Sequence, residues 1–242
     1  MPGLAALALS GIAAFGLVRL QAAGGVKIDF YSDDESPDPV PGAVIRELLE
    51  AAARAPSGGN LQPWVVHALA GQPLADFKAQ VAARLMDRDE PEYHVYPPNL
   101  WEPLRTRRYQ VGEDLYGALN IPREDKLGRL RQFAQNAEFF GAPVAVFFSV
   151  HRDCGPPQWS DIGMYMQSLM LLAVERGLDT CAQEFWSVYG KLVAGFIDLP
   201  ADHMLFCGMA LGYRDETAAV NNWRSQREPF REWGTMRGFE GG

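Results

Sequence analysis

The sequence has few cysteines and no excess of positive charge, and both shortages exclude classes of protein. It contains three cysteines, Cys154, Cys181 and Cys207, without the paired spacing of a disulfide framework or a zinc cluster. Lysine and arginine number 22 against 30 aspartates and glutamates, which gives a net charge of −8. Because neutralising phosphates requires a basic surface, we expect no nucleic-acid partner. We also expect no bound metal, and a reducing, cytoplasmic location.

The motifs of the common nucleotide-binding and hydrolytic folds are missing as well. There is no Gly-x-Gly-x-x-Gly after a strand, no P-loop and no Gly-x-Ser-x-Gly. One apolar run near the start, residues 4–18, is shorter than the ~20 residues of a membrane span. No Lys or Arg precedes it, as one would in most secretory signals. A signal or anchor and an N-terminal helix packed on the body are both left open, and we expect no membrane partner.

What is present fits one globular domain that contains both helices and strands. Hydrophobic residues make up 48% of the chain and charged residues 21%, which is enough to bury a sizeable core. Helical spacing of apolar residues predicts helices over 42–55 and 72–84. A third helix, 162–176, is apolar on nearly all sides and should be buried, with Ser160 and Asp161 as N-terminal caps. Apolar, β-branched and aromatic runs predict strands over 64–69, 143–150, 180–185 and 204–211. These elements predict an α+β fold.

The stretch with the most chemistry follows the first helix, over residues 54–64, and reads RAPSGGNLQPW. Its two glycines allow positive φ and a close approach of the backbone to a ligand. Ser57, Asn60 and Gln62 then offer a hydroxyl and two amides, each amide carrying a donor and an acceptor. A heterocycle edge that alternates donors and acceptors, such as that of a flavin, suits this set. Ordinary turn chemistry between a helix and a strand is the alternative.

This stretch resembles the signature of the FMN-dependent nitroreductase family, whose members commonly read A-P-S-G-x-N-x-Q-P-W here. A second similarity lies at residues 206–213, FCGMALGY, and continues through 220–221 and 224–229. Two separated motifs in the family's order are far more specific than one. The resemblance implies a single nitroreductase-like domain over residues 38–242, with an atypical N-terminal segment, 1–37, outside the similarity.

The resemblance also implies an architecture and an activity. Members are three-layer sandwiches, with a mixed central sheet flanked by helices, and form intertwined homodimers with FMN at the subunit interface. The expected reaction takes hydride from NADH or NADPH and passes it to a small electron acceptor, such as a nitroaromatic or a quinone. Because such chemistry belongs to the cofactor, no catalytic side chain is predicted.

The cofactor-binding residues that the resemblance implies fall into three groups. One group, in the loop, holds the flavin ring and ribityl chain; a second borders its reactive edge through backbone amides; a third meets the phosphate. They are Ser57, Gly58, Asn60 and Gln62, then Gln183 and Glu184, then Arg224 and Arg227. An Arg-Arg-Ser motif, which holds the phosphate in many relatives, is absent, and residues 27–32 read KIDFYS instead.

Several alternatives are left open by the sequence. The aromatic segment 87–103, with Tyr93, Tyr96 and Trp101, fits a lid over a planar acceptor or a connection anchored to the core. Another flavin reaction on this fold, such as reductive dehalogenation or flavin cleavage, is an alternative activity. Because the N-terminal arginine motif is missing, a flavin-free binding protein is the alternative from another class.

A first prediction concerns Arg227, whose guanidinium offers a fork of donors that matches phosphate geometry. Since a hydrogen bond to a charged group contributes roughly 1.5–3 kcal/mol, Arg227→Ala should weaken FMN binding by about one to two orders of magnitude. The double change with Arg224→Ala should weaken it further. Titration of FMN into the apoproteins, followed by flavin fluorescence, measures this. Equal dissociation constants would remove Arg227 from the site.

Overall fold

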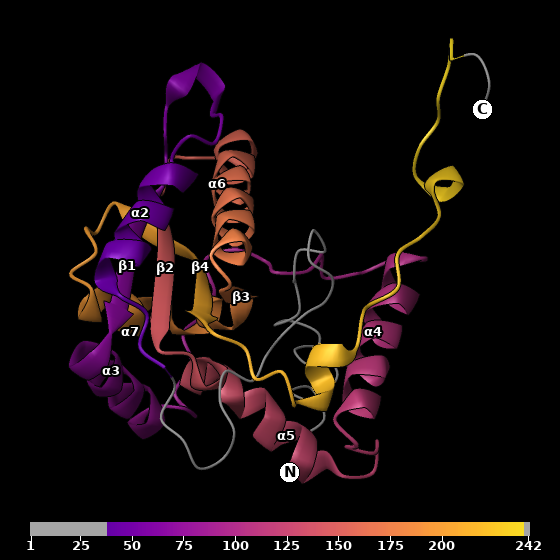
Figure 1. Cartoon of the computed structure of the whole chain (residues 1–242), viewed down its shortest axis with the longest axis horizontal. Coiled ribbons are helices and arrows are strands. Elements are labelled where there is room, and N and C mark those ends of the chain that lie inside the picture. Colours follow the sequence, from indigo (N-terminus) through magenta and orange to yellow (C-terminus); the bar gives the residue numbers. More distant parts are fainter. Residues whose placement is uncertain (1–37, 240–242) are drawn as a thin grey trace.

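The computed structural model describes residues 38–239, so the expectations for segment 1–37 lie outside the described residues. Its centre is a four-stranded sheet in the order β1-β2-β4-β3 (Figure 1). The strands are β1 (Val65–Ala70), β2 (Val144–His151), β3 (Asp179–Gln183) and β4 (His203–Gly212). All four were predicted to within two residues at each end.

Every pair of neighbouring strands in this sheet is antiparallel. The predicted mixed sheet is therefore wrong for the residues that the structure describes. β2 and β3 do run in the same direction, but β4 lies between them and runs the opposite way. β1 and β4 likewise run in the same direction and are separated by β2, so this strand order makes no two parallel strands neighbours.

Helices cover both faces of the sheet and make three layers, as the α+β sandwich requires. One face packs on α2 (Gly42–Ala52) and α6 (Pro156–Glu175), which lie together in Figure 1. The other packs on α3 (Gly71–Ala83), α7 (Gly190–Phe196) and the 3-10 turns η2 (Gln135–Gly141) and η3 (Glu184–Tyr189). β2 is buried on both sides because Val146 and Phe148 face the first group while Phe147 faces the second.

The longest described helix, α6, begins six residues earlier than predicted. It starts at Pro156, where proline is tolerated because the N–H of that position has no helical partner. The backbone N–H of Gly155 donates to Oε1 of Gln158 at 3.2 Å and closes the helix start. Ser160 and Asp161 therefore lie inside the helix and do not cap it. Serine and aspartate are both favoured N-cap residues, which explains why these two were wrongly predicted as caps.

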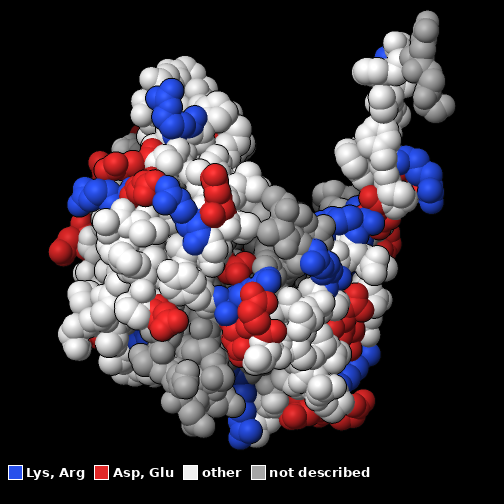
Figure 2. Space-filling view, in the orientation of Figure 1, with Lys and Arg blue, Asp and Glu red and all other residues white. Residues whose placement is uncertain are grey.

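The rest of the chain forms a helical pair and an arm beside this sandwich. α4 (Leu104–Ala118) and α5 (Lys126–Ala134) are joined by the ion pair of Arg129 with Glu113, at 2.6 Å. After β4 the chain follows α4 and then leaves the body as the C-terminal arm, residues 223–239 (Figures 1 and 2). Arg107 of α4 binds Glu228 of the arm at 2.9 Å.

Candidate functional site

The 57–62 loop, which carries four of the predicted residues, follows α2 and leads into β1. Three of its residues have positive φ: Gly59 and Asn60 at 58° and Gln62 at 50°. Hydrogen bonds inside the loop support this shape, because the N–H of Gln62 donates to Oγ of Ser57 at 3.0 Å. The side-chain amide of Gln62 also donates to the carbonyl of Asn60, at 3.2 Å. The loop is a compact, largely exposed turn.

The loop is tied to the body by a residue that sequence reasoning did not assign to the site. The N–H of Gly58 donates to both carboxylate oxygens of Asp161 on α6, at 3.3 Å each. Asp161 is 4% exposed. An aspartate directly before a predicted buried helix was the signal available in the sequence, and we predicted it to be a cap instead.

The groups that the loop presents fit the flavin that the resemblance implies. Asn60 and Gln62 are exposed, so their amide donors and acceptors are accessible to a ligand. A Cβ built on Gly58 or Gly59 would meet no atom within 4 Å, so open space lies beside the backbone there. Alternating amide donors and acceptors beside open backbone suit a planar heterocycle with a polar edge.

Gln183 and Glu184 end β3 and begin η3, and the structure gives their side chains opposite roles. The Gln183 amide is fully buried: Nε2 donates to the carbonyl of Asn136 at 2.8 Å, and Oε1 accepts from Nε1 of Trp186 at 3.3 Å. This side chain belongs to the core. Only its backbone is left for the predicted cofactor contact.

Glu184 is half-buried, and within residues 38–239 no hydrogen bond to its carboxyl is found. Loss of water raises its pKa to about 7. Its charge acts in turn on Tyr93, Tyr96 and Cys207, whose pKa values rise chiefly through burial and further through Glu184. Glu184 thus sits among two phenols and a buried thiol, as a carboxyl that changes charge near neutral pH.

The aromatic segment 87–103 is anchored to the body at Tyr93. Its hydroxyl donates to the carbonyl of Phe206, its ring stacks on Phe206 with centroids 5.9 Å apart, and Trp159 lies 5.8 Å away. Tyr96 is covered by the guanidinium of Arg108, 3.8 Å from the ring centroid. For these two tyrosines the structure favours the anchored connection over the lid. Trp101, by contrast, is 59% exposed.

Arg224 and Arg227 lie in the C-terminal arm, which Figure 1 shows beside α4 and across the molecule from α2. Nη1 of Arg227 donates to Oγ of Ser225 at 2.7 Å and to the carbonyl of Gln226 at 3.0 Å. No hydrogen bond between the arm and the 57–62 loop is found in the described part of the chain. A single chain therefore does not bring Arg224 and Arg227 to the other predicted cofactor-binding residues in the 57–62 loop.

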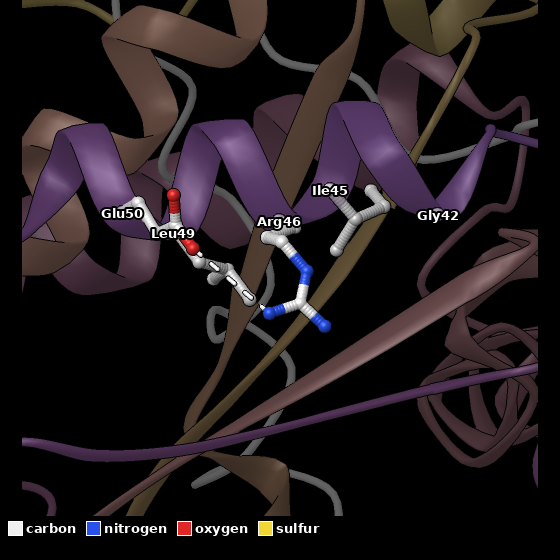
Figure 3. Close-up of a pocket in the computed structure, with 5 residues that line it drawn as sticks. All are labelled: Gly42, Ile45, Arg46, Leu49 and Glu50. Atoms are coloured by element: carbon white, nitrogen blue, oxygen red, sulfur yellow. Dashed lines mark ion pairs between the residues drawn. The ribbon is translucent and has the colours of Figure 1, made fainter.

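A hollow of about 350 Å³ lies beside α2 and is lined by Gly42, Ile45, Arg46, Leu49 and Glu50 (Figure 3). Arg46 and Glu50 pair across it, one helical turn apart, at 3.9 Å. The hollow contains none of the predicted site residues.

The three-layer α+β fold and the amide-bearing loop are those expected of a flavin-dependent oxidoreductase. Comparison with known proteins makes the assignment specific: residues 36–213 match the model of the nitroreductase family. The chain belongs to this family, and the prediction of the family is confirmed.

Similar proteins are known in sequence and in structure. The chain is 35% identical over 204 residues to 4-nitrobenzoate reductase from Pseudomonas putida, covering 84% of this chain and 90% of that protein. The FMN and NADPH-dependent nitroreductase NfnB from Sphigopyxis sp. strain HMH is 45% identical, with a TM-score of 0.82 over 88% of this chain and 95% of that one. The FMN-dependent nitroreductase NfnB from Mycobacterium smegmatis, solved with NADPH, is 29% identical, with a TM-score of 0.78 over 87% and 93%.

The raised pKa of Glu184 predicts how stability depends on pH. Between the ordinary value of 4.5 and about 7, the folded protein keeps a proton that the unfolded chain releases. The free energy of unfolding should therefore fall as pH rises through this window and stay low above it. Glu184→Gln removes the charge, so apo Glu184→Gln should be more stable than wild type near pH 8, by up to about 3 kcal/mol, and similar near pH 4.

Urea denaturation of the two apoproteins at both pH values measures this difference. The same change at Glu90, an exposed glutamate of the 87–103 segment, is the matched control and should show no such difference. If wild type and Glu184→Gln differ equally at both pH values, the carboxyl does not titrate in this window.

Proposed function

We propose that the protein is an FMN-dependent nitroreductase that takes hydride from NADH or NADPH and reduces a nitroaromatic acceptor. The observation that carries the proposal is the 57–62 loop: a turn with internal hydrogen bonds that presents two exposed amide side chains beside open backbone. The names of the relatives support the reaction, since they include reductases of 4-nitrobenzoate and nitrobenzene and proteins described as dependent on FMN and NADPH. The domain that performs it spans residues 38–242.

In this proposal, bound FMN would supply the hydride and electron transfer, and the chain binds and orients the reactants. Ser57, Asn60 and Gln62 orient the ring, and the backbone of Gln183 and Glu184 borders its reactive edge. The phosphate binds Arg224 and Arg227 of the arm. The cytoplasm is the location we propose, because all three cysteines are free thiols.

The two half-reactions share one pocket in this proposal, which predicts ping-pong kinetics. Reciprocal plots of initial rate against NADPH concentration, at several fixed concentrations of 4-nitrobenzoate, should be parallel. The apoprotein should be inactive and should recover activity and yellow colour on addition of FMN. Converging lines would contradict the shared pocket, and full activity without flavin would overturn the proposed function.

We further propose that the protein acts as an intertwined homodimer, with the arm of each chain covering the other. Several large apolar side chains of the arm are exposed: Phe230 at 45%, Trp233 at 69%, Met236 at 61% and Phe239 at 72%. Contiguous exposed apolar side chains of this kind are typical of interfaces. A partner chain would bury them, and its arm would bring Arg224 and Arg227 to a loop that the same chain's arm does not reach.

The combined change Trp233→Ala and Met236→Ala should weaken dimerisation by about tenfold or more, because buried aromatic anchors dominate interface energies. Met86→Ala is the control, since Met86 is 91% exposed on the body and outside the arm. Sedimentation equilibrium of the apoproteins over a range of concentrations measures the dissociation constants. A wild type that stays monomeric, or a double variant that dimerises equally well, would remove the arm from the interface.

A further inference from the structure

Asp161 is a buried carboxylate with little to compensate for its burial. Its residue is 4% exposed, and among residues 38–239 no cation pairs with it. The N–H of Gly58 is its partner, shared between the two oxygens at 3.3 Å each. Burying a charge is costly unless it is paired or hydrogen-bonded, and apolar and aromatic residues fill the other buried positions of α6 without this cost. For packing alone, an aspartate is the wrong residue here.

The face of α6 that carries Asp161 also holds both flanks of the 57–62 loop. Tyr165 lies one helical turn further on, and therefore on the same face. Its hydroxyl donates to the carbonyl of Leu49 in α2 at 3.0 Å, before the loop. Its ring lies 5.0 Å from that of Trp64, after the loop. α6 thus holds the chain on both sides of the loop through Tyr165, and the loop itself through Asp161.

The loop contains one residue in a conformation that its type does not favour. Gly59 and Asn60 are types that tolerate positive φ, but Gln62 also has a φ of 50°, a region that costs such a residue roughly 1 kcal/mol or more. Such conformations persist when surrounding contacts fix them. The side-chain contacts of Ser57 and Gln62 hold the turn within itself. Among residues 38–239, the bond from Gly58 to Asp161 is the hydrogen bond found between the loop and the helices and sheet, and it fixes the loop's position relative to them.

From these contacts we propose that Asp161 is a positioning residue for FMN binding, which acts through the backbone N–H of Gly58 and sets where the amides of Asn60 and Gln62 lie. The proposal rests on the proposed function, because FMN is the ligand that the loop receives. Asp161 does not touch the ligand in this mechanism. Asp161 holds the loop in its binding conformation before FMN binds, so less ordering of the loop is needed on binding.

Changes at Asp161 test the carboxylate. Asp161→Ala should weaken FMN binding about ten- to a hundredfold, since it removes a hydrogen bond to a charged group and frees the loop. Asp161→Asn keeps an acceptor oxygen and should stay within about threefold of wild type. Asp153→Ala is the matched control, because Asp153 is an exposed aspartate shortly before α6 and should leave FMN affinity unchanged. Titration of FMN into folded apoprotein gives the dissociation constants.

Changes at Gly58 test the donor. Ser57 has φ of −141° and ψ of 145°, a conformation compatible with a following proline, and no atom lies within 4 Å of a Cβ at Gly58. Gly58→Pro removes the N–H, whereas Gly58→Ala keeps it, so the difference between them isolates this bond. Gly58→Pro should bind FMN about as weakly as Asp161→Ala. The double variant Gly58→Pro with Asp161→Ala should be no weaker than either single change.

A readout without flavin separates this proposal from the proposed function. In wild-type apoprotein the Gly58 amide should exchange slowly with solvent, and Asp161→Ala should accelerate the exchange at residues 58–62 at least tenfold. If wild type does not bind FMN, the proposed function and the role of Asp161 in FMN binding both fail, and exchange then decides only whether Asp161 orders the loop. If wild type binds FMN but Asp161→Ala binds it equally well, or the two single changes add in the double variant, the positioning role is overturned and the function stands.

Discussion

The burial of α6 is the constraint on which the rest of the structure depends. This helix packs against the sheet through Ile162, Leu169 and Ala173 and lies beside α2 (Figure 1). Because burying each large apolar side chain contributes roughly 1.5–3 kcal/mol, packing leaves the helix little freedom to rotate or slide. Residues on its first turns are therefore held at fixed places. Trp159 lies against the anchored tyrosine of the 87–103 segment, and Asp161 lies under the 57–62 loop.

Gln183 and Glu184 show how adjacent residues at a strand end diverge. Gln183 points into the core, where Asn136 and Trp186 satisfy its amide. Glu184 follows at the start of η3 and loses water without gaining such partners among the described residues, and this burial raises its pKa to about 7. The difference comes from the surroundings, since both residues are long, polar and next to each other. A buried polar group with partners stabilises one conformation, and one without partners changes its protonation instead.

The C-terminal arm combines polar attachment to its own chain with apolar exposure. Glu228 binds Arg107 of α4, and Arg227 is held by its neighbours in the arm. Beyond Pro229 the exposed side chains include those of Phe230, Trp233, Met236 and Phe239, and Figure 2 shows this part standing clear of the body. Such a segment gains little stability from contacts with its own chain. Under the proposed dimer, apolar burial against the partner would offset the entropy of ordering it.

The sequence by itself determined the strands, three of the six described α-helices, the family and the residues of the 57–62 loop. These are local signals: apolar runs mark buried strands, helical spacing marks helices, and glycine, proline and asparagine mark the turn. The wrong prediction that Ser160 and Asp161 cap a helix had a local cause too, since serine and aspartate are favoured N-cap residues in any sequence.

Tertiary structure decided what connects distant residues. The antiparallel order β1-β2-β4-β3, the burial of Gln183, the anchoring of Tyr93 on Phe206 and the bond from Gly58 to Asp161 join segments far apart in the chain. Gly58 and Asp161 are 103 residues apart. Periodicity shows which face of a helix is buried but not which N–H meets that face, because this depends on how the whole core packs.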